Sequence, residues 1–258
     1  MSATEELSFL QSDRLGVSRV AGQVPCEQEV AIYVNWQELV SLMCTPLLVE
    51  ELALGFLFNE GLIAGMDDVA VCRACGSERC VDVWLHRAVE FPLRRIVTSG
   101  CAGGTTFARE LASGSPITSA TRVTAAQIGQ WMEQLFAAMP IFHDAGGSHA
   151  SALVAADGTL VAAEDLGRHN SLDKVAGRCL REGIPLDGRV LLTTGRISSE
   201  MVRKAARMRT PILISRTSPT SLSVQLARAW NVTLVGYVRG RKLRVYTGEE
   251  RVILPGGV

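Results

Sequence analysis

Cys101 is the residue of this chain whose surroundings most favour chemistry. It stands in residues 98–106, a run of glycines and hydroxyl-bearing residues (TSGCAGGTT). A cysteine that only fills a core normally has apolar neighbours on a helix or strand, whereas glycines let the backbone fold back in a loop. We therefore expect the Cys101 thiol to be exposed and mobile. An available thiolate is a nucleophile, so this loop is a candidate site of covalent chemistry.

Four loops in the second half of the chain share another design. Each follows a predicted strand and carries arginines, usually with hydroxyl-bearing residues: 164–170 (EDLGRHN), 194–198 (TGRIS), 216–220 (RTSPT) and 239–242 (RGRK). The first three lead into predicted helices, with Asn170, Ser198 or Ser218 as the N-cap. Helix N-termini and arginine forks both bind anions, and ligands of open α/β sheets bind at the carboxyl ends of strands. The loops therefore indicate a polyanionic small ligand, such as a nucleotide or a pyrophosphate.

A plainer interpretation exists for each loop. An arginine can pair with a local carboxylate, and a serine or asparagine can simply cap a helix. That explanation suffices for any one loop, whereas all four together favour a ligand. Asp165 and His169 lie close enough in sequence for acid–base catalysis, but we favour a histidine that orients its loop through a hydrogen bond. His149 is open to the same two interpretations.

The cysteines at 72, 75 and 80 have the density of a metal knuckle, and His86 is a possible fourth ligand. Structural zinc sites usually combine two closely spaced pairs, and the second pair is missing here. We therefore expect unligated cysteines and no permanent metal. Three further cysteines lie in helix-like or strand-like segments, where they would act as small core residues: Cys26, Cys44 and Cys179.

Composition sets broad limits on the class of protein. The 258 residues are 47% hydrophobic, enough for a sizeable core, and 26 basic residues balance 26 acidic ones. That balance argues against nucleic acid or an acidic membrane as a partner. No segment approaches the ~20 apolar residues of a membrane span, and residues 1–12 lack a signal-peptide core. We therefore expect a cytoplasmic protein with reduced thiols.

Sequence patterns divide the chain into a tail over residues 1–20, an N-terminal lobe over 21–120 and an α/β domain over 121–258. The lobe should contain a strand at 29–35, a helix from the N-cap Thr45 to Gly61, and two strands within 69–98. In the α/β domain, Thr124 should cap a helix over 124–139, and a hairpin should join 151–155 to 159–163. Alternating strands and helices follow: strands 189–193, 211–215, 232–238 and 243–247, and helices 171–182, 199–208 and 219–230. Their strand–helix–strand connections predict a partly parallel sheet.

Several motifs in order resemble the FdhD family, the formate dehydrogenase accessory sulfurtransferases, over about residues 28–247. The motif at 164–170 (EDLGRHN), followed by 172–174 (LDK), is the most specific. The others are 45–46 (TP), 51–56 (ELALGF), 60–61 (EG), 147–150 (GSHA), 194–196 (TGR), 215–216 (SR) and 219–222 (PTSL).

The resemblance implies a fold and a function. The fold would be a cytidine-deaminase-like three-layer α/β/α domain with a mixed sheet, preceded by a smaller α+β lobe, in a homodimer. The function would be to take sulfur from a cysteine desulfurase as a persulfide and pass it to the molybdenum bis(molybdopterin guanine dinucleotide) of formate dehydrogenase, which is bound as a substrate.

The resemblance also implies site residues. It assigns the persulfide to Cys101 and cofactor contact to Tyr237, Val238, Arg239, Gly240, Arg241 and Lys242. From loop placement we add Arg168, His169, Arg196 and Arg216 as assisting residues.

The chain departs from the related patterns at two places. Gly104 stands where the family has the second cysteine of a Cys-x-x-Cys pair, so a disulfide within that pair is impossible, although a persulfide carrier needs only one thiol. Ala150 and Ser151 follow His149, so the deaminase zinc signature is absent. This argues against a zinc-dependent nucleoside enzyme. The main alternative function is a non-catalytic chaperone that binds and inserts the guanine-dinucleotide cofactor.

Overall fold

The structure is a computed structural model that describes residues 2–14, 16–76, 79–89, 95–97, 105–107, 116–155 and 157–255. For 95–97 and 105–107, only the backbone is described. Cys101, Gly104 and most of their loop therefore lie outside the described residues.

A six-stranded mixed sheet forms the centre of the second half of the chain, in the order β11-β10-β12-β13-β14-β15. Its strands are β10 (His149–Val154), β11 (Leu160–Asp165), β12 (Val190–Thr193), β13 (Ile212–Ser215), β14 (Thr233–Arg239) and β15 (Lys242–Thr247). The neighbours β12, β13 and β14 run parallel, and the remaining pairs are antiparallel. This arrangement confirms the mixed sheet and the hairpin predicted across Asp157.

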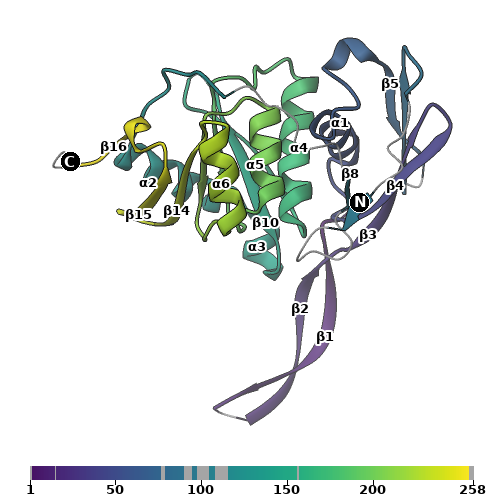
Figure 1. Ribbon diagram of the computed structural model, residues 1–258. Coiled ribbons are helices and arrows are strands. Elements are labelled where there is room, and N and C mark those ends of the chain that lie inside the picture. The colour runs from purple at the N-terminus through teal and green to yellow at the C-terminus, as the bar shows by residue number, and fades with distance from the viewer. Residues whose placement is uncertain are drawn as a thin grey trace.

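Helices cover both faces of this sheet (Figure 1). On one face lie α4 (Arg168–Arg181), α5 (Ser199–Arg207) and α6 (Ser221–Ala229), and on the other lies α2 (Ala125–Ala137), followed by α3 (Pro140–Ala145). Alternate strand residues enter the two apolar layers: Leu191 and Leu213 belong to the cluster that includes α4 and α5, whereas Leu192 belongs to the α2 cluster. The three-layer α/β arrangement is therefore confirmed, while the narrower cytidine-deaminase-like description stays a prediction.

A four-stranded sheet in the order β4-β3-β6-β5 and the helix α1 (Val49–Asn59) form most of the described first half. Its strands are β3 (Gln28–Val34), β4 (Gln37–Cys44), β5 (Val69–Ala74) and β6 (Cys80–Leu85). Small elements complete the chain: β7 (Arg95–Val97), β8 (Thr105–Phe107), β9 (Val123–Thr124), β16 (Val252–Ile253), and the 3-10 turns η1 (Met66–Asp68) and η2 (Glu249–Arg251). Buried Val30, Ile32 and Val34 confirm the strand predicted at 29–35.

The first and second halves share one apolar core, which contains Ile32 from β3, Leu52 from α1 and Leu172 from α4. At the contact of α1 with α4, two glycines let the backbones touch. A Cβ on Gly55 would lie 1.8 Å from the Asp173 carbonyl oxygen, and one on Gly177 would lie 1.8 Å from that of Glu51. No side chain fits at either position.

Residues 1–20, which we expected to be a tail or a loosely tied first segment, belong to a paired hairpin. Strands β1 (Thr4–Asp13) and β2 (Gly16–Pro25) pair along their whole length and project from the body (Figure 1). The sequence did not indicate these strands, because acidic and polar residues surround the short alternation at Leu7 and Phe9, which lies on one face of the hairpin.

The predicted helix starts are confirmed at Ser198 and Thr124. The Ser198 hydroxyl accepts a hydrogen bond from the Met201 N–H, and Thr124 forms a capping box with Gln127. The other predicted caps are wrong. Helix α1 begins at Val49 after Leu48, whose φ is 54°, and the N-cap of α4 is Gly167 rather than Asn170.

The cap of α6 is Thr220, two residues after the predicted Ser218, so Pro219 precedes the helix. Ser223 explains the difference, because it completes a capping box with Thr220. The predictions for Thr45 and Asn170 failed for another reason, because both side chains bind elsewhere. The Thr45 hydroxyl donates to Asp165, and the Asn170 amide donates to the Met43 carbonyl.

We predict that Gly55→Ala lowers the free energy of unfolding by about 3 kcal/mol or more, because the added methyl meets the rigid backbone of α4. Urea unfolding would measure the change. Gly65→Ala is the control, since a Cβ there meets nothing within 4 Å and should leave stability nearly unchanged. Equal stability of the two variants would contradict the close helix contact.

Candidate functional site

The four loops singled out in the sequence meet at one edge of the central sheet. Strands β12, β13 and β14 are parallel, and β11 runs in the same direction because both it and β12 are antiparallel to β10. Their carboxyl ends therefore lie together, beside the start of β10 and the N-termini of α4, α5 and α6. We call this the cationic edge; it is the lower edge of the body in Figure 1.

Asp165, at the end of β11, holds the start of α4 in place. Its Oδ1 accepts hydrogen bonds from the Gly167 N–H at 2.8 Å and the Asn170 amide at 3.0 Å. Its Oδ2 accepts from the N–H and the hydroxyl of Thr45, each at 3.0 Å, and lies 2.5 Å from Lys174 Nζ. Lys174 also donates to Thr45, and neither charged side chain is exposed. The pair is thus a structural tie, and Asp165 is not a partner of His169.

Glu164, the neighbour of Asp165, has a separate structural role. Its carboxylate accepts hydrogen bonds from the N–H groups of Ile141 and Phe142, at 2.9 and 2.7 Å, in the first turn of α3. The Ser148 hydroxyl donates to the same carboxylate at 2.5 Å. A carboxylate at free helix N–H groups is favourable, so Glu164 fixes α3 and the start of β10 beside the cationic edge.

His169 lies in a buried polar chain between α4 and α5. Its Nε2 is 3.2 Å from Ser198 Oγ and 3.4 Å from Glu200 Oε2. Glu200 in turn lies 3.6 Å from Lys204 Nζ, which binds Asp173 at 2.6 Å. Burial alone would lower the pKa of Lys204, but the two carboxylates outweigh it and raise that pKa, so Lys204 stays charged.

Both histidines near the edge are neutral. Burial, with Lys204 and Arg168 nearby, lowers the pKa of His169 to about 2. Burial, Arg168 and Arg196 also lower the pKa of His149, whose Nδ1 lies 3.4 Å from the Thr194 hydroxyl. A neutral imidazole that contacts a helix cap fits the loop-orienting role that we favoured for His169 over acid–base catalysis.

Arg168 is buried, unlike most of the predicted cationic residues. A Cβ on Gly195 would lie 2.6 Å from the Arg168 Cβ, so the absence of a side chain at 195 makes room for the arginine stem. This contact joins the start of α4 to the loop after β12. Arg168 therefore adds to the positive field at His149 and His169 rather than forming an exposed contact.

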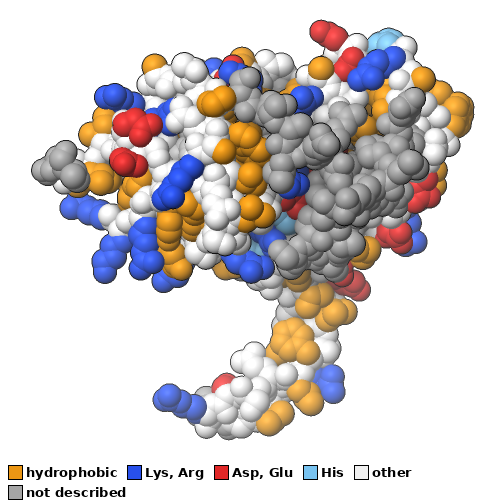
Figure 2. Space-filling view, viewed as in Figure 1, with side chains coloured by type: hydrophobic (Ala, Val, Ile, Leu, Met, Phe, Trp, Pro, Cys, Tyr) orange, Lys and Arg blue, Asp and Glu red, His pale blue; other side chains and the backbone are white. Residues whose placement is uncertain are grey.

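Exposed cations at this edge are available to an anion. Arg196, Arg216, Arg239 and Arg241 are exposed, and none has a carboxylate partner among the described residues. Arg216 is held by cation–π contact, with its guanidinium carbon 4.3 Å from the centre of the Phe136 ring on α2. Figure 2 shows Lys and Arg side chains gathered along the lower part of the body. The plainer interpretation, in which each arginine pairs locally, does not hold for these four.

Residues 237–242 form the end of β14, the turn and the start of β15. Tyr237 has a φ of 54°, its N–H donates to the Thr217 carbonyl at 3.1 Å, and its ring lies under Arg244. Val238 is buried against the α2 layer, so only its backbone remains for a ligand. Arg239, Gly240, Arg241 and Lys242 are all exposed in the turn. The predicted contact segment thus divides into a packed half and an exposed cationic half.

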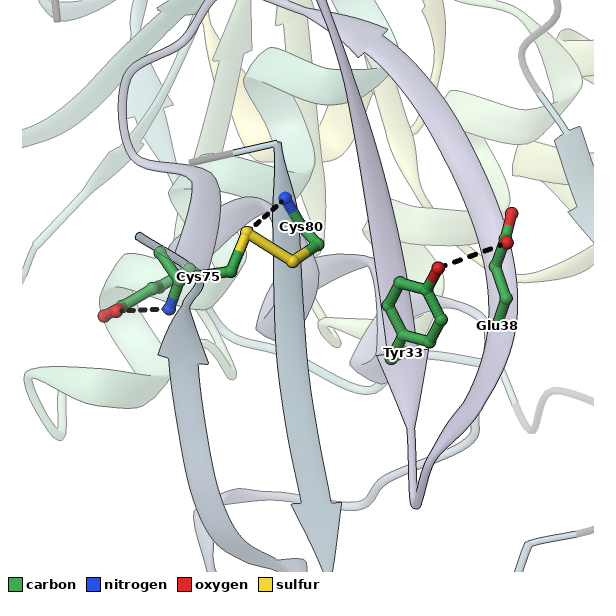
Figure 3. Close-up of a disulfide and its surroundings, with 6 residues drawn as sticks. Tyr33, Glu38, Cys75 and Cys80 are labelled. Carbon is green, nitrogen blue, oxygen red and sulfur yellow. Dashed lines mark hydrogen bonds between the residues drawn. A yellow bond between two sulfur atoms is a disulfide. The ribbon is translucent and has the colours of Figure 1, made fainter. Parts of the chain in front are cut away.

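Cys75 and Cys80 form a disulfide between the ends of β5 and β6 (Figure 3). The expectation of reduced thiols is wrong for this pair, because the antiparallel strands bring the two Cα atoms to 5.4 Å, within disulfide range. Cys26, Cys44, Cys72 and Cys179 are free. Burial raises the pKa values of Cys44, Cys72 and Cys179 to about 12.

Two further observations limit the kind of site. In the part of the chain that is described, no three His, Cys, Asp or Glu side chains are grouped to hold a metal ion. No described helix is both long enough and apolar enough to cross a membrane.

Lys174 and Lys204 are the important residues that the sequence reasoning missed. Lys174 belongs to a motif that we quoted, and Lys204 lies on a helix that we predicted, but we assigned neither a role. The available signal was weak: a lysine within an otherwise buried helix face, such as Lys174 beside Leu172 and Val175, favours a paired core charge.

The fold and the edge together define a three-layer α/β protein whose strand ends carry exposed arginines. A family model for the FdhD/NarQ family matches residues 25–253. The chain belongs to the FdhD/NarQ family.

Individual relatives agree with this assignment. The sulfur carrier protein FdhD of Listeria innocua is 34% identical over 241 residues, which cover 90% of this chain and 92% of that protein. The protein of the same name from Anaeromyxobacter dehalogenans strain 2CP-1 is 36% identical and covers 92% and 91% of the two chains. A crystal structure of a formate dehydrogenase accessory protein from Desulfotalea psychrophila has a TM-score of 0.83 and 27% identity, over 98% of this chain and all of that one.

We predict that acid destabilises the protein partly through His169. The pKa of His169 is about 2 in the folded chain and 6.5 in the reference state, so the unfolded chain takes up the proton first as the pH falls. The stabilisation is complete above about pH 6.5 and is lost toward pH 2. Between pH 7.5 and 5 the loss should be about 2 kcal/mol.

Urea unfolding at several pH values would test this. His169→Gln should flatten the dependence, whereas His143→Gln, at an exposed position on α3, should keep it. His149 contributes in the same direction, so some slope should remain in the His169 variant. An unchanged slope in His169→Gln would reject the buried neutral imidazole.

Proposed function

We propose that this chain carries sulfur for formate dehydrogenase. Its relatives are named sulfur carrier proteins, and its structural neighbour is named a formate dehydrogenase accessory protein. Cys101 would receive sulfur from a cysteine desulfurase, and the acceptor would be the molybdenum bis(molybdopterin guanine dinucleotide) bound as substrate at the cationic edge. The protein would work in the cytoplasm as a homodimer. One observation carries the ligand part of this proposal: four exposed arginines at the carboxyl ends of the strands have no carboxylate partner within the described part of the chain.

The sulfur step requires a single thiolate. The Cys101 thiolate attacks the terminal sulfur of the desulfurase persulfide, the sulfur–sulfur bond of the donor breaks, and the donor cysteine leaves as a thiolate. Cys101 then holds the persulfide, with no net oxidant or reductant consumed. Gly104 in place of a second cysteine is compatible with this step, because the persulfide needs no resolving thiol.

The other cysteines support Cys101 as the carrier. Cys44, Cys72 and Cys179 are held as thiols by their raised pKa values, and a thiol is a poor nucleophile. Cys75 and Cys80 are bonded to each other. Cys26 is free and half-buried, so it is the necessary control.

Guanine dinucleotide tails suit the cationic edge. Each tail carries a pyrophosphate, and guanidinium groups bind phosphate oxygens through paired hydrogen bonds. Arg239 and Arg241 would contact the phosphates from the β14–β15 turn, with Arg196 and Arg216 beside them. Arg168 and His169 are buried, so they would assist from the layer below the exposed arginines.

Incubation with a cysteine desulfurase and cysteine should add one sulfur atom to the protein, as read by mass spectrometry of the intact chain. Cys101→Ala should remove the adduct, because it removes the attacking thiolate. Cys26→Ala and Cys72→Ala should keep it. An absent adduct, or one that survives Cys101→Ala, would reject the carrier role and leave the chaperone interpretation.

GDP, a fragment of the guanine dinucleotide tail, should bind the cationic edge, and calorimetry would measure its affinity. Arg239→Ala should weaken binding by about tenfold or more, since it removes a charge-assisted contact. Arg209→Ala is the matched control, because this exposed arginine lies before β13, at the opposite edge of the sheet. Equal affinities of the parent and Arg239→Ala would reject this contact.

A further inference from the structure

Strands β1 and β2 form a long arm that has few contacts with the other described elements. The two strands pair from Thr4 opposite Pro25 to Asp13 opposite Gly16. Ten extended residues span about 33 Å. The main contact of the arm with the body is α3, near the base, and the remainder projects away (Figures 1 and 2).

One face of the arm is an apolar stripe. Residues opposite each other on paired strands share a face, so Leu7, Phe9, Val20 and Val24 lie on the same side. Leu7 is 45% exposed and Phe9 is 41% exposed. The Phe9 ring lies over Gly22, where a Cβ would come within 2.8 Å of the ring.

An isolated two-stranded hairpin is at best marginally stable in water. Single exposed apolar residues are ordinary, but a continuous apolar stripe on a projecting hairpin indicates a surface that another molecule covers. We therefore expect another molecule to cover the apolar stripe of the arm.

An apolar hollow of about 250 Å³ lies at the base of the arm, and we call it the foot hollow. Its lining includes Leu47, Leu48, Ala138, Ile141 and Ala163. Leu47 and Leu48 are each 38% exposed, so the hollow presents apolar side chains to the outside. It has space for large apolar side chains such as those of the stripe.

The arm of a chain cannot fill the foot hollow of the same chain. Thr4, the first residue of β1, lies on the rim of the hollow. Phe9 lies five residues further along an extended strand, about 17 Å away. Among the described residues, nothing covers the stripe or the hollow, and the geometry of the arm lets these two apolar surfaces meet only between two chains.

We propose that the occupant is a second copy of this chain, with each arm laying Leu7 and Phe9 on the foot hollow of the other. A two-fold dimer requires that each chain supply both surfaces, and this chain has both. The inference deepens the proposed function by naming the surface of the homodimer. It rests on that part of the proposal and not on sulfur transfer.

The area of the arm agrees with a specific dimer. Two strands about 10 Å wide and 33 Å long present a face of roughly 300 Å². Two arms and the two surfaces that receive them then bury roughly 1,200 Å², the lower limit of stable protein–protein interfaces. Contacts between the bodies would add to this area.

Sedimentation velocity on the full chain tests the arm. The parent chain should be a dimer, and Phe9→Asp should be a monomer, because a carboxylate cannot enter the apolar hollow without a partner. Leu10→Asp is the matched control: Leu10 is 63% exposed and lies on the opposite face of the same strand, so this variant should remain a dimer. Circular dichroism should show that both variants keep the fold.

A mixing experiment tests the exchange itself. Leu48→Asp should also be monomeric, and aspartate tolerates the positive φ of this position. A mixture of Phe9→Asp with Leu48→Asp should form a heterodimer, because one undamaged arm can still reach one undamaged foot hollow. It should be weaker than the parent dimer, since only one of two contacts remains.

Several results would overturn the inference: a monomeric parent chain, equal dissociation of Phe9→Asp and Leu10→Asp, or a mixture that stays monomeric. Protection of the arm from hydrogen exchange only when formate dehydrogenase is added would assign the arm to that enzyme instead. Sulfur loading of the parent chain separates the two proposals, because a monomeric parent chain that still gains the Cys101 adduct would reject the arm exchange and leave the sulfur-carrier proposal standing.

Discussion

The buried ion pair between Asp165 and Lys174 is the interaction on which the candidate site depends. Neither side chain is exposed, and charge without solvent is tolerated only when its hydrogen bonds are satisfied. Thr45 from the first half and Gly167 and Asn170 from the second complete the carboxylate shell. One carboxylate therefore joins β11, the start of α4 and the segment before α1, and so fixes the point from which Arg168 and His169 extend.

The residue types of the motif at 164–170 suggest a ligand site, but its side chains hold neighbouring elements of the fold in place. Glu164 holds α3, Asp165 holds α4, and His169 contacts the N-cap of α5. Its charged groups are directed at neighbouring elements rather than at solvent. The exposed cations that have no carboxylate partner in the described ranges lie on later loops, at Arg196 and Arg239 among others. A rigid inner layer thus supports an exposed cationic layer.

Local patterns were sufficient for most helices, for the alternating strand around Ile32 and for two caps, because these depend on neighbours in sequence. Thr45 was predicted wrongly because a carboxylate 120 residues away binds its hydroxyl. The Cys75–Cys80 disulfide depends on the pairing of β5 and β6, which spacing alone does not show. The arginine loops lie at one edge of the sheet, as the sequence indicated, because the connections determine the strand directions. The burial of Arg168 was not predictable in this way, because it depends on the missing side chain at Gly195.

The glycine contact between α1 and α4 has a mechanical consequence. Because the backbones touch at Gly55 and Gly177, a small sliding or rocking of one helix on the other would press main-chain atoms together. The two halves also share one apolar core, so opening the chain between them like a hinged clamp would expose that core to water. A bulky ligand of the kind proposed for the strand ends would approach them from outside, and side chains and loops at the cationic edge would adjust to its size.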